Sequence, residues 1–230
     1  MISVCIATYN GEKYLRQQVD SVLAQLGGED ELIISDDSST DATIDIIKSY
    51  QDKRIKLFEK QTFHSPIFNF ENAIKHASGE IIFLADQDDK WLSGRVERAL
   101  EMHQQGYDLV LCNTRSIYTD YVEEGRLNPF NRSYWMNLLK PAYVGCCMSF
   151  KRSILDIALP FPKAIAMHDL WIGLLAQRNF KCGFLEEPLI EYNRHDESFI
   201  AKHSFSLKKR IQYRWNMLRL VLQREKEMKR

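Results

Sequence analysis

The sequence predicts an α/β domain whose mostly parallel sheet is flanked by helices, and three observations support this prediction. Short apolar segments alternate with segments of helical periodicity through residues 2–113, which is typical of parallel strands connected by helices. The apolar segments are continuous runs rather than alternating ones, as strands buried on both faces require. A chain of 230 residues with 45% apolar and 27% charged residues is sufficient for one globular domain.

The first half of the chain carries most of this alternation. We expect strands at residues 2–7, 31–35, 55–59, 81–85 and 109–113. We expect helices, from apolar residues at helical spacing, at residues 14–26, 44–47, 70–77 and 95–103. Gly27 and Gly28 end the first helix, and the capping residues of segment 36–41 precede the second.

The second half of the chain is less regular. Residues 114–141 lack clear periodicity, so we expect a long loop region there. An apolar stretch, YVGCCMSF, occupies residues 143–150. Further elements are expected as a helix after Lys151, a helix at 169–178, and strands near 182–185 and 189–192.

Composition excludes several classes of protein. The net charge is zero, so we expect no nucleic-acid partner for the whole molecule. The five cysteines are an odd number without a CxxC pair, which favours reduced thiols in a cytoplasmic protein. The start, MISVCIATYN, lacks the features of a signal peptide, and no apolar run approaches the ~18 residues of a membrane span.

Polar clusters follow three of the expected strands, at residues 8–10, 36–37 and 86–89. In open parallel sheets, ligands bind beyond the carboxyl ends of the strands, so these clusters are expected to converge. Oxygen-rich clusters favour Mg²⁺ or Mn²⁺, which is commonly completed by substrate phosphates. The alternative is that DQDD is only a polar turn that caps the next helix.

Other phosphate and metal motifs do not fit. An EF-hand counted from Asp86 would require Asp or Asn at its fifth position and Gly at its sixth, where this chain has Lys90 and Trp91. Neither a P-loop nor a GxGxxG motif is present in the sequence. A diphosphate at this site would therefore depend on the metal for charge neutralisation.

Six segments taken together resemble a known family. They are SVCIATYNGEKYLRQQVDSVLAQ (3–25), IISDDSSTDAT (33–43), ASGEIIFLADQDDKW (77–91), GCCMSFKRSIL (145–155), MHDLWIGLLA (167–176) and YNRH (192–195). In this order they resemble a family 2 glycosyltransferase of the bacterial rhamnosyltransferase-like branch. The resemblance implies a GT-A fold, with a Rossmann-like sheet and a smaller acceptor-side lobe.

The resemblance also implies roles for individual residues. It places Thr8 and Tyr9 at the nucleotide base, Asp37 at the base or ribose, and Asp86 and Asp88 as the first and last acids of a DxD motif. Asp89 would help through water. The implied nucleotide-binding residues are Thr8, Tyr9, Asn10, Asp37 and Asp86. The implied ligands of Mn²⁺ or Mg²⁺ are Asp88, Asp86 and His195.

Asp169 matches the catalytic base of the family. A carboxylate can take the proton of an acceptor hydroxyl during attack, and displacement with one base and no covalent intermediate inverts the anomeric carbon. The family usually has Glu-Asp here, whereas this chain has His168 before Asp169. His168 could alter the pKa of the base or bind the acceptor, and Asp169 could instead only cap its helix.

The segment 206–230 carries nine Lys or Arg against two Glu, a net charge of +7. Helical spacing places Ile211, Trp215, Leu218 and Leu222 on one face. Such a helix can lie on an anionic membrane surface, or pack on the catalytic domain or on a second subunit in a homodimer. We therefore separate it from a domain of residues 1–205, whose halves are 1–113 for the nucleotide sugar and 114–205 for the acceptor.

The sequence thus indicates an inverting glycosyltransferase that moves a sugar from a UDP- or dTDP-linked donor to a glycan or lipid-linked glycan. The resemblance implies surface polysaccharide synthesis in the cytoplasm, peripheral on the inner face of the membrane. A sugar nucleotidyltransferase is an alternative, but it would need a glycine-rich basic loop after the first strand, which TYNGEKY matches poorly. A non-catalytic nucleotide-binding protein of the same fold is the other alternative.

Overall fold

The computed structural model describes residues 1–118, 121–124, 133–194 and 206–228. Its described strands form a single sheet in the order β3-β2-β1-β4-β8-β6-β9-β5, with β7 paired to β6. The strands are β1 Ile2–Thr8, β2 Glu31–Asp36, β3 Ile55–Phe58, β4 Ile81–Asp86, β5 Lys90–Trp91, β6 Leu109–Ile117, β7 Val122–Glu124, β8 Met148–Lys151 and β9 Cys182–Asn193.

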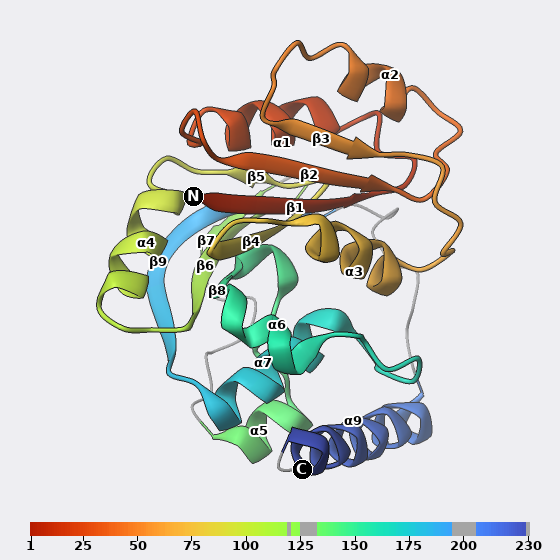
Figure 1. Ribbon diagram of the computed structural model, residues 1–230, viewed down its shortest axis with the longest axis vertical. Helices are drawn as coiled ribbons and strands as arrows, with labels where there is room; N and C mark the ends of the chain where they lie inside the picture. The colour runs from red at the N-terminus through yellow and green to blue at the C-terminus, as the bar shows by residue number, and fades with distance from the viewer. Residues whose placement is uncertain (119–120, 125–132, 195–205, 229–230) are drawn as a thin grey trace.

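Helices cover both faces of the sheet. They are α1 Leu15–Leu23, α2 Thr43–Lys48, α3 Pro66–His76, α4 Arg95–Gln104, α5 Tyr134–Leu139, α6 Leu155–Ala158, α7 His168–Asn179 and α9 Leu207–Met228, with 3₁₀ turns η1 Gly145–Cys147 and η2 Arg152–Ile154. Figure 1 shows α1 and α2 above the N-terminal strands, α3 below them, and α5, α7 and α9 gathered at the opposite end of the molecule.

The N-terminal half confirms the predicted mostly parallel sheet. Strands β3, β2, β1 and β4 are all parallel neighbours, and every residue of β2 is buried. The register pairs Thr8 with Asp36 and Ala7 with Asp86. Because neighbouring parallel strands end at the same edge, the polar residues that follow them are brought together there.

The C-terminal half mixes strand directions. Strand β8 runs antiparallel between β4 and β6, β9 pairs parallel with β6, and β5 pairs antiparallel with β9. The two strands expected near 182–185 and 189–192 are one strand, β9, because register shifts opposite Asn113 take up the intervening residues. A β-bulge of this kind leaves no clear signal in local sequence periodicity.

The expected long loop at residues 114–141 is also wrong over its described parts. Strand β6 continues to Ile117 because β9 goes on pairing with it, β7 then pairs back on β6, and α5 forms at Tyr134–Leu139. The helix expected after Lys151 is the 3₁₀ turn η2 followed by the single turn of α6.

Helix α9 packs on the domain through a face that differs from the expected one. Met217 and Val221 are fully buried, and the Arg224 guanidinium donates hydrogen bonds of 2.7–2.9 Å to carbonyl oxygens of the segment 157–160. Ile211 and Trp215, which the helical spacing predicted for the apolar face, are 61% and 67% exposed. None of the described helices is long and apolar enough to cross a membrane.

Candidate active site

The ends of β1 and β2 are joined by side-chain hydrogen bonds. Thr8 is fully buried, and its Oγ1 donates to Oδ2 of Asp36 at 2.8 Å. Asn69 of α3 donates through Nδ2 to the Thr8 carbonyl oxygen at 3.0 Å. Thr8 therefore links β1 to β2 and to α3 at this edge of the sheet. Its predicted contact with a nucleotide base stays a prediction.

Tyr9 and Asn10 form the open rim of this edge. Gln87, from the DQDD segment, holds the backbone of Tyr9 with bonds of 2.9 Å from the Tyr9 N–H and 3.1 Å to its carbonyl. The Tyr9 side chain is 57% exposed, so its ring is accessible for stacking. Asn10 has a φ of 47°, a left-handed conformation that Asn tolerates, and its Oδ1 accepts the Thr40 N–H at 2.9 Å.

Asp37 is buried beneath the segment that leads into α3. Its Oδ1 accepts the Phe63 N–H at 2.6 Å, and its Oδ2 accepts the Ser65 N–H at 3.1 Å. Ser65 is the residue immediately before α3. Asp37 thus fixes the start of α3, and a direct contact between Asp37 and a nucleotide stays a prediction.

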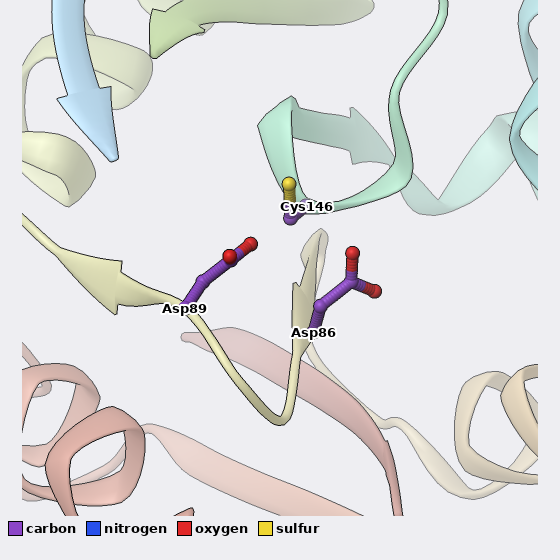
Figure 2. A group of neighbouring side chains, drawn as sticks. All are labelled: Asp86, Asp89 and Cys146. Carbon is purple, nitrogen blue, oxygen red and sulfur yellow. The ribbon is translucent and has the colours of Figure 1, made fainter. Parts of the chain in front are cut away.

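Two of the DQDD carboxylates meet a thiol from a distant part of the chain. The ligand atoms of Asp86, Asp89 and Cys146 all lie within 4.8 Å of one another. Figure 2 shows Asp86 at the end of β4, Asp89 just before β5, and Cys146 of η1 beside both. We call these three residues the acidic-thiol group.

The acidic-thiol group is crowded with potential negative charge. Burial, with the charges of Asp88 and Asp169, raises the pKa of Asp86 to about 7. Burial, with the charges of Asp86 and Asp88, holds the pKa of Asp89 well above its usual range. A proton or a cation is therefore needed for these carboxyls to lie so close together.

Asp88 lies on the same turn but is not a member of the acidic-thiol group. It is partly exposed, and its backbone carbonyl accepts a hydrogen bond from Nδ2 of Asn193 at the end of β9. His195, the third predicted metal ligand, lies outside the described residues. Carboxylates on a turn that is partly open to solvent fit Mn²⁺ or Mg²⁺, so Asp86 and Asp88 stay the predicted ligands for either ion.

Asp169 occupies the first turn of α7, near the acidic-thiol group. Its Oδ1 accepts the Leu170 N–H at 2.6 Å, and the Gly145 N–H also bonds its carboxylate. Burial raises the pKa of Asp169 to about 6, although the Arg214 charge from α9 acts to lower it. The residue before α7 is Met167, so Asp169 is not the N-cap residue, although its carboxylate accepts a first-turn N–H of the helix.

The 3₁₀ turn η1 connects this candidate base to the acidic-thiol group. A Cβ added to Gly145 would lie 3.8 Å from the Asp169 Cβ and 3.0 Å from Nε2 of His168. The next residue along, Cys146, lies beside Asp86 and Asp89. The carboxyl of Asp169, the acidic-thiol group and the exposed Tyr9 thus lie at one edge of the sheet.

The two roles that the sequence left open for His168 stay predictions. Its ring is buried and stacks on Phe70 with ring centroids 4.3 Å apart. Burial lowers the pKa of His168 to about 3, so the ring is neutral near pH 7. Among the described residues, neither of its ring nitrogens has a hydrogen-bond partner.

Three residues at or near the site are not among those predicted from the sequence: Gln87, Cys146 and Arg214. Only Gln87 carried a signal that could have identified it, because it lies between predicted ligands. The other two reach the site from segments about 60 and 130 residues away in the chain, as a tertiary fold allows.

Comparison with known proteins matches the chain to a protein family and to curated relatives. A family model described as Glycosyl transferase family 2 matches residues 3–157. The UDP-Glc:alpha-D-GlcNAc-diphosphoundecaprenol beta-1,3-glucosyltransferase WfgD of Escherichia coli is 26% identical, over 95% of this chain and 85% of that protein.

Two solved structures share the fold. The Staphylococcus aureus TarS 1-349 complex with UDP-GlcNAc superposes with a TM-score of 0.77 at 19% identity, covering 97% of this chain and 66% of that one. The Pyrobaculum calidifontis mannosyltransferase PcManGT, solved with GDP-Man and Mn²⁺, gives a TM-score of 0.60 at 19% identity, covering 81% of this chain and 54% of that one. These superpositions confirm the expected GT-A fold.

Proposed function

Because the chain belongs to glycosyl transferase family 2, we propose that it transfers a sugar from a nucleoside-diphosphate sugar to a hydroxyl of a lipid-linked glycan. The observation that carries the proposal is the junction at η1, where the Gly145 N–H bonds the candidate base Asp169 and Cys146 lies within 4.8 Å of the ligand atoms of Asp86 and Asp89. A base beside a site for a diphosphate is the arrangement that transfer between a hydroxyl and an activated sugar needs.

The donor is proposed to lie along the ends of β1, β2 and β4. The exposed Tyr9 ring suits a nucleotide base, and Thr8, Asn10 and Asp37 shape the adjoining backbone. The donor complexes of TarS and PcManGT, which share the fold, support this class of ligand. UDP- or dTDP-linked sugars are the proposed donors, held by the half of the chain at residues 1–113.

Mn²⁺ or Mg²⁺ is the proposed cofactor, with Asp86 and Asp88 as its ligands and His195 as a further candidate. When bound, the ion would stabilise the charge that develops on the leaving diphosphate. Asp169 is proposed to take the proton of the acceptor hydroxyl, and a single displacement of this kind inverts the anomeric carbon. The acceptor is proposed to bind against residues 114–205.

A lipid-linked acceptor, such as the one in the name of WfgD, would bring the enzyme to a membrane surface. The exposed residues Ile211, Trp215 and Leu222 form one stripe of α9, because their spacing returns them to the same side of the helix. The exposed Lys208 and Arg219 flank this stripe. We therefore propose that segment 206–230 places the enzyme peripherally on the anionic inner face of the cell membrane in surface polysaccharide synthesis.

A thermal-shift panel of UDP-, dTDP- and GDP-sugars, with and without Mn²⁺, tests the proposal. We expect one nucleotide class to raise the melting temperature, and Mn²⁺ to enlarge that shift. Asp88→Ala should abolish the Mn²⁺-dependent part. A matched control is Asp45→Ala, which removes a surface carboxylate of α2 away from the site. Equal responses from wild type and Asp88→Ala would refute the metal assignment.

Turnover is tested separately, with the bound sugar donor and an undecaprenyl-diphosphate-linked saccharide as acceptor. We expect transfer with inversion, lost in Asp169→Asn while donor binding is kept. A protein that binds the donor and never transfers its sugar to this or other lipid-linked acceptors would instead be a non-catalytic nucleotide-binding member of the fold.

A further inference from the structure

The face of α9 that packs on the domain carries two arginines at its N-terminal end. Met217 and Val221 of this face are fully buried, and the Ala166 N–H donates to the Met217 Sδ at 3.5 Å. Helical spacing returns Arg210 and Arg214 to the same face, because they precede Met217 by seven and three residues. Since Ala166 leads directly into α7, the arginines lie near the start of that helix.

The candidate base at the start of α7 is an electrostatic neighbour of this pair. Burial raises the pKa of Asp169, and the Arg214 charge acts to lower it. Burial and the Arg210 charge lower the pKa of Arg214, and the Asp169 charge acts to raise it. Two like charges one helical turn apart repel each other, so the fold holds excess positive charge beside Asp169.

Arg214 is half-buried without a partner of its own. Within the described part of the chain, its guanidinium has no hydrogen bond and no ion pair. The other arginines of this interface are satisfied: Arg224 donates three hydrogen bonds to carbonyl oxygens of segment 157–160, and Arg178 of α7 pairs with Glu225. A partly buried charge without a partner is costly, which points to an anion that arrives with a ligand.

We propose that Arg210 and Arg214 bind the diphosphate group of the acceptor, next to the hydroxyl whose proton Asp169 takes. This inference rests on the proposed function and adds the part of the acceptor that the chain recognises. A guanidinium suits phosphate oxygens because it donates two parallel N–H bonds. Two guanidiniums match the charge of a diphosphate that links a saccharide to a lipid.

The donor diphosphate has a separate place in this arrangement. It is proposed to lie at the turn that carries Asp86 and Asp88, whereas the arginines belong to α9. The charge of Asp169 acts both on Asp86 and on Arg214, so the base is near both positions. A phosphate on Arg214 and a hydroxyl at Asp169 therefore belong to adjacent parts of one acceptor.

The neighbouring face of α9 suits the lipid of the same acceptor. Ile211 and Trp215, which are 61% and 67% exposed, each follow one of the arginines by a single residue. One residue turns an α-helix by about 100°, so the apolar side chains lie on the face next to Arg210 and Arg214. One helix can thus contact the diphosphate with one face and the membrane that holds the lipid with the next.

Calorimetric binding of geranyl diphosphate to the full chain tests this site without any sugar transfer. A chelator is present, so that no metal ion at the DQDD turn can hold the probe. We expect Arg214→Gln and Arg210→Gln each to weaken binding by about tenfold or more, since each loses a charge-assisted contact. Lys226→Gln, which removes an exposed positive charge from the last turn of α9, should bind the probe like wild type.

Steady-state kinetics then compare two acceptors, an alkyl-diphosphate-linked saccharide and the uncharged alkyl glycoside of the same saccharide. We expect Arg214→Gln to raise the KM of the charged acceptor about tenfold or more and to leave that of the uncharged one unchanged. A purely structural role of Arg214 would change both acceptors alike, and that result would overturn the proposal.

Two further results would also overturn the proposal. One is binding of geranyl diphosphate that is absent in wild type or equally tight in both arginine variants. The other is loss of co-sedimentation with phosphatidylglycerol vesicles in Arg214→Gln while geranyl diphosphate binding is kept, which would assign the arginines to lipid headgroups. Failure of the proposed function is distinguishable, because a protein without transfer activity would still bind geranyl diphosphate in a manner that depends on Arg214.

Discussion

The backbone N–H of Asn193 donates a 3.1 Å hydrogen bond to Oδ1 of Asp89. The Asn193 side chain also donates to the carbonyl of Asp88. Asn193 at the end of β9 therefore holds the turn at residues 86–89, which we call the acidic turn, by two hydrogen bonds. The two segments are more than 100 residues apart in sequence. Without this support, the repulsion between the carboxylates would be free to open the turn.

Replacing Asn193 with Ala should loosen the acidic turn. We expect a loss of about 1 kcal/mol in the free energy of unfolding, since one side-chain hydrogen bond is removed, together with weaker Mn²⁺ binding. Asn179→Ala is the control, because Asn179 also donates to a backbone carbonyl, that of Leu175 in α7. Urea unfolding should show similar stability losses in the two variants. Mn²⁺ titration should show a loss of affinity only in Asn193→Ala. Unchanged Mn²⁺ affinity in Asn193→Ala would show that the turn does not need this hydrogen bond.

Cation binding at the acidic turn should depend on pH. The pKa of Asp86 is raised to about 7, first by burial and then by the charges of Asp88 and Asp169. Below about pH 7 a cation must displace a proton from this carboxyl, so the apparent affinity should fall by up to tenfold for each pH unit. Calorimetric Mn²⁺ titrations across this range should show it, and a flat profile from about pH 5.5 to about pH 8 would contradict it.

Asp169→Asn should remove transfer activity while keeping the fold. Loss of a general base commonly costs 10²–10⁴-fold in rate, so we expect a kcat decrease of about this size. Because the pKa of Asp169 is raised to about 6 by burial, the wild-type kcat/KM should rise with pH through about 6. A conserved rate in Asp169→Asn would exclude Asp169 as the base.

The raised pKa of Asp169 also predicts how the free energy of unfolding depends on pH. Between its unfolded pKa near 3.9 and its folded pKa, the native state holds a proton that the unfolded state releases, so this contribution to the free energy of unfolding falls as pH rises. In Asp169→Asn this part of the pH dependence should disappear, and the variant should gain stability relative to wild type above about pH 6. Urea unfolding at several pH values, with a chelator present, measures the difference.

Ile211 and Trp215 should anchor the protein to anionic vesicles. We expect the double substitution of both by Ser to reduce co-sedimentation with phosphatidylglycerol vesicles by tenfold or more, since burying each side chain contributes about 1.5–3 kcal/mol. Val122→Ser is the control, because Val122 is 56% exposed on β7, away from α9. Binding that is the same for wild type and the double variant, or for anionic and neutral vesicles, would rule out this surface.

Gly173 should be intolerant of any side chain. A Cβ there would lie 2.3 Å from Cδ1 of Tyr143, whose ring is 4% exposed and cannot move aside without disturbing the core. We expect Gly173→Ala to cost about 3 kcal/mol by overpacking and to displace α7, which carries Asp169. At Gly28 an added Cβ would meet nothing within 4 Å, so Gly28→Ala should leave the free energy of unfolding, measured with urea, within about 0.5 kcal/mol of wild type. Equal effects of the two substitutions would argue against this packing.

The sequence alone determined the strands and helices of the N-terminal half, except the two-residue strand β5, and the edge of the sheet that carries the site. Continuous apolar runs of four to eight residues and helical spacing are local signals, so they survive without knowledge of distant contacts. The positions of Thr8, Asp37 and Asp86 at strand ends followed from those runs, and parallel pairing brought them to one edge.

Only the tertiary structure decided which side chains join there from far along the chain. Cys146 reaches Asp86 because β8, which follows η1, inserts beside β4, and no local pattern specifies that pairing. Helix α9 carries apolar residues around most of its circumference, so periodicity could not select the face that packs. The buried face of α9 carries Met217 and Val221, whereas Ile211 and Trp215 are exposed. This face is set by contact with α5, α6 and α7, and that contact surface exists only after those helices have assembled.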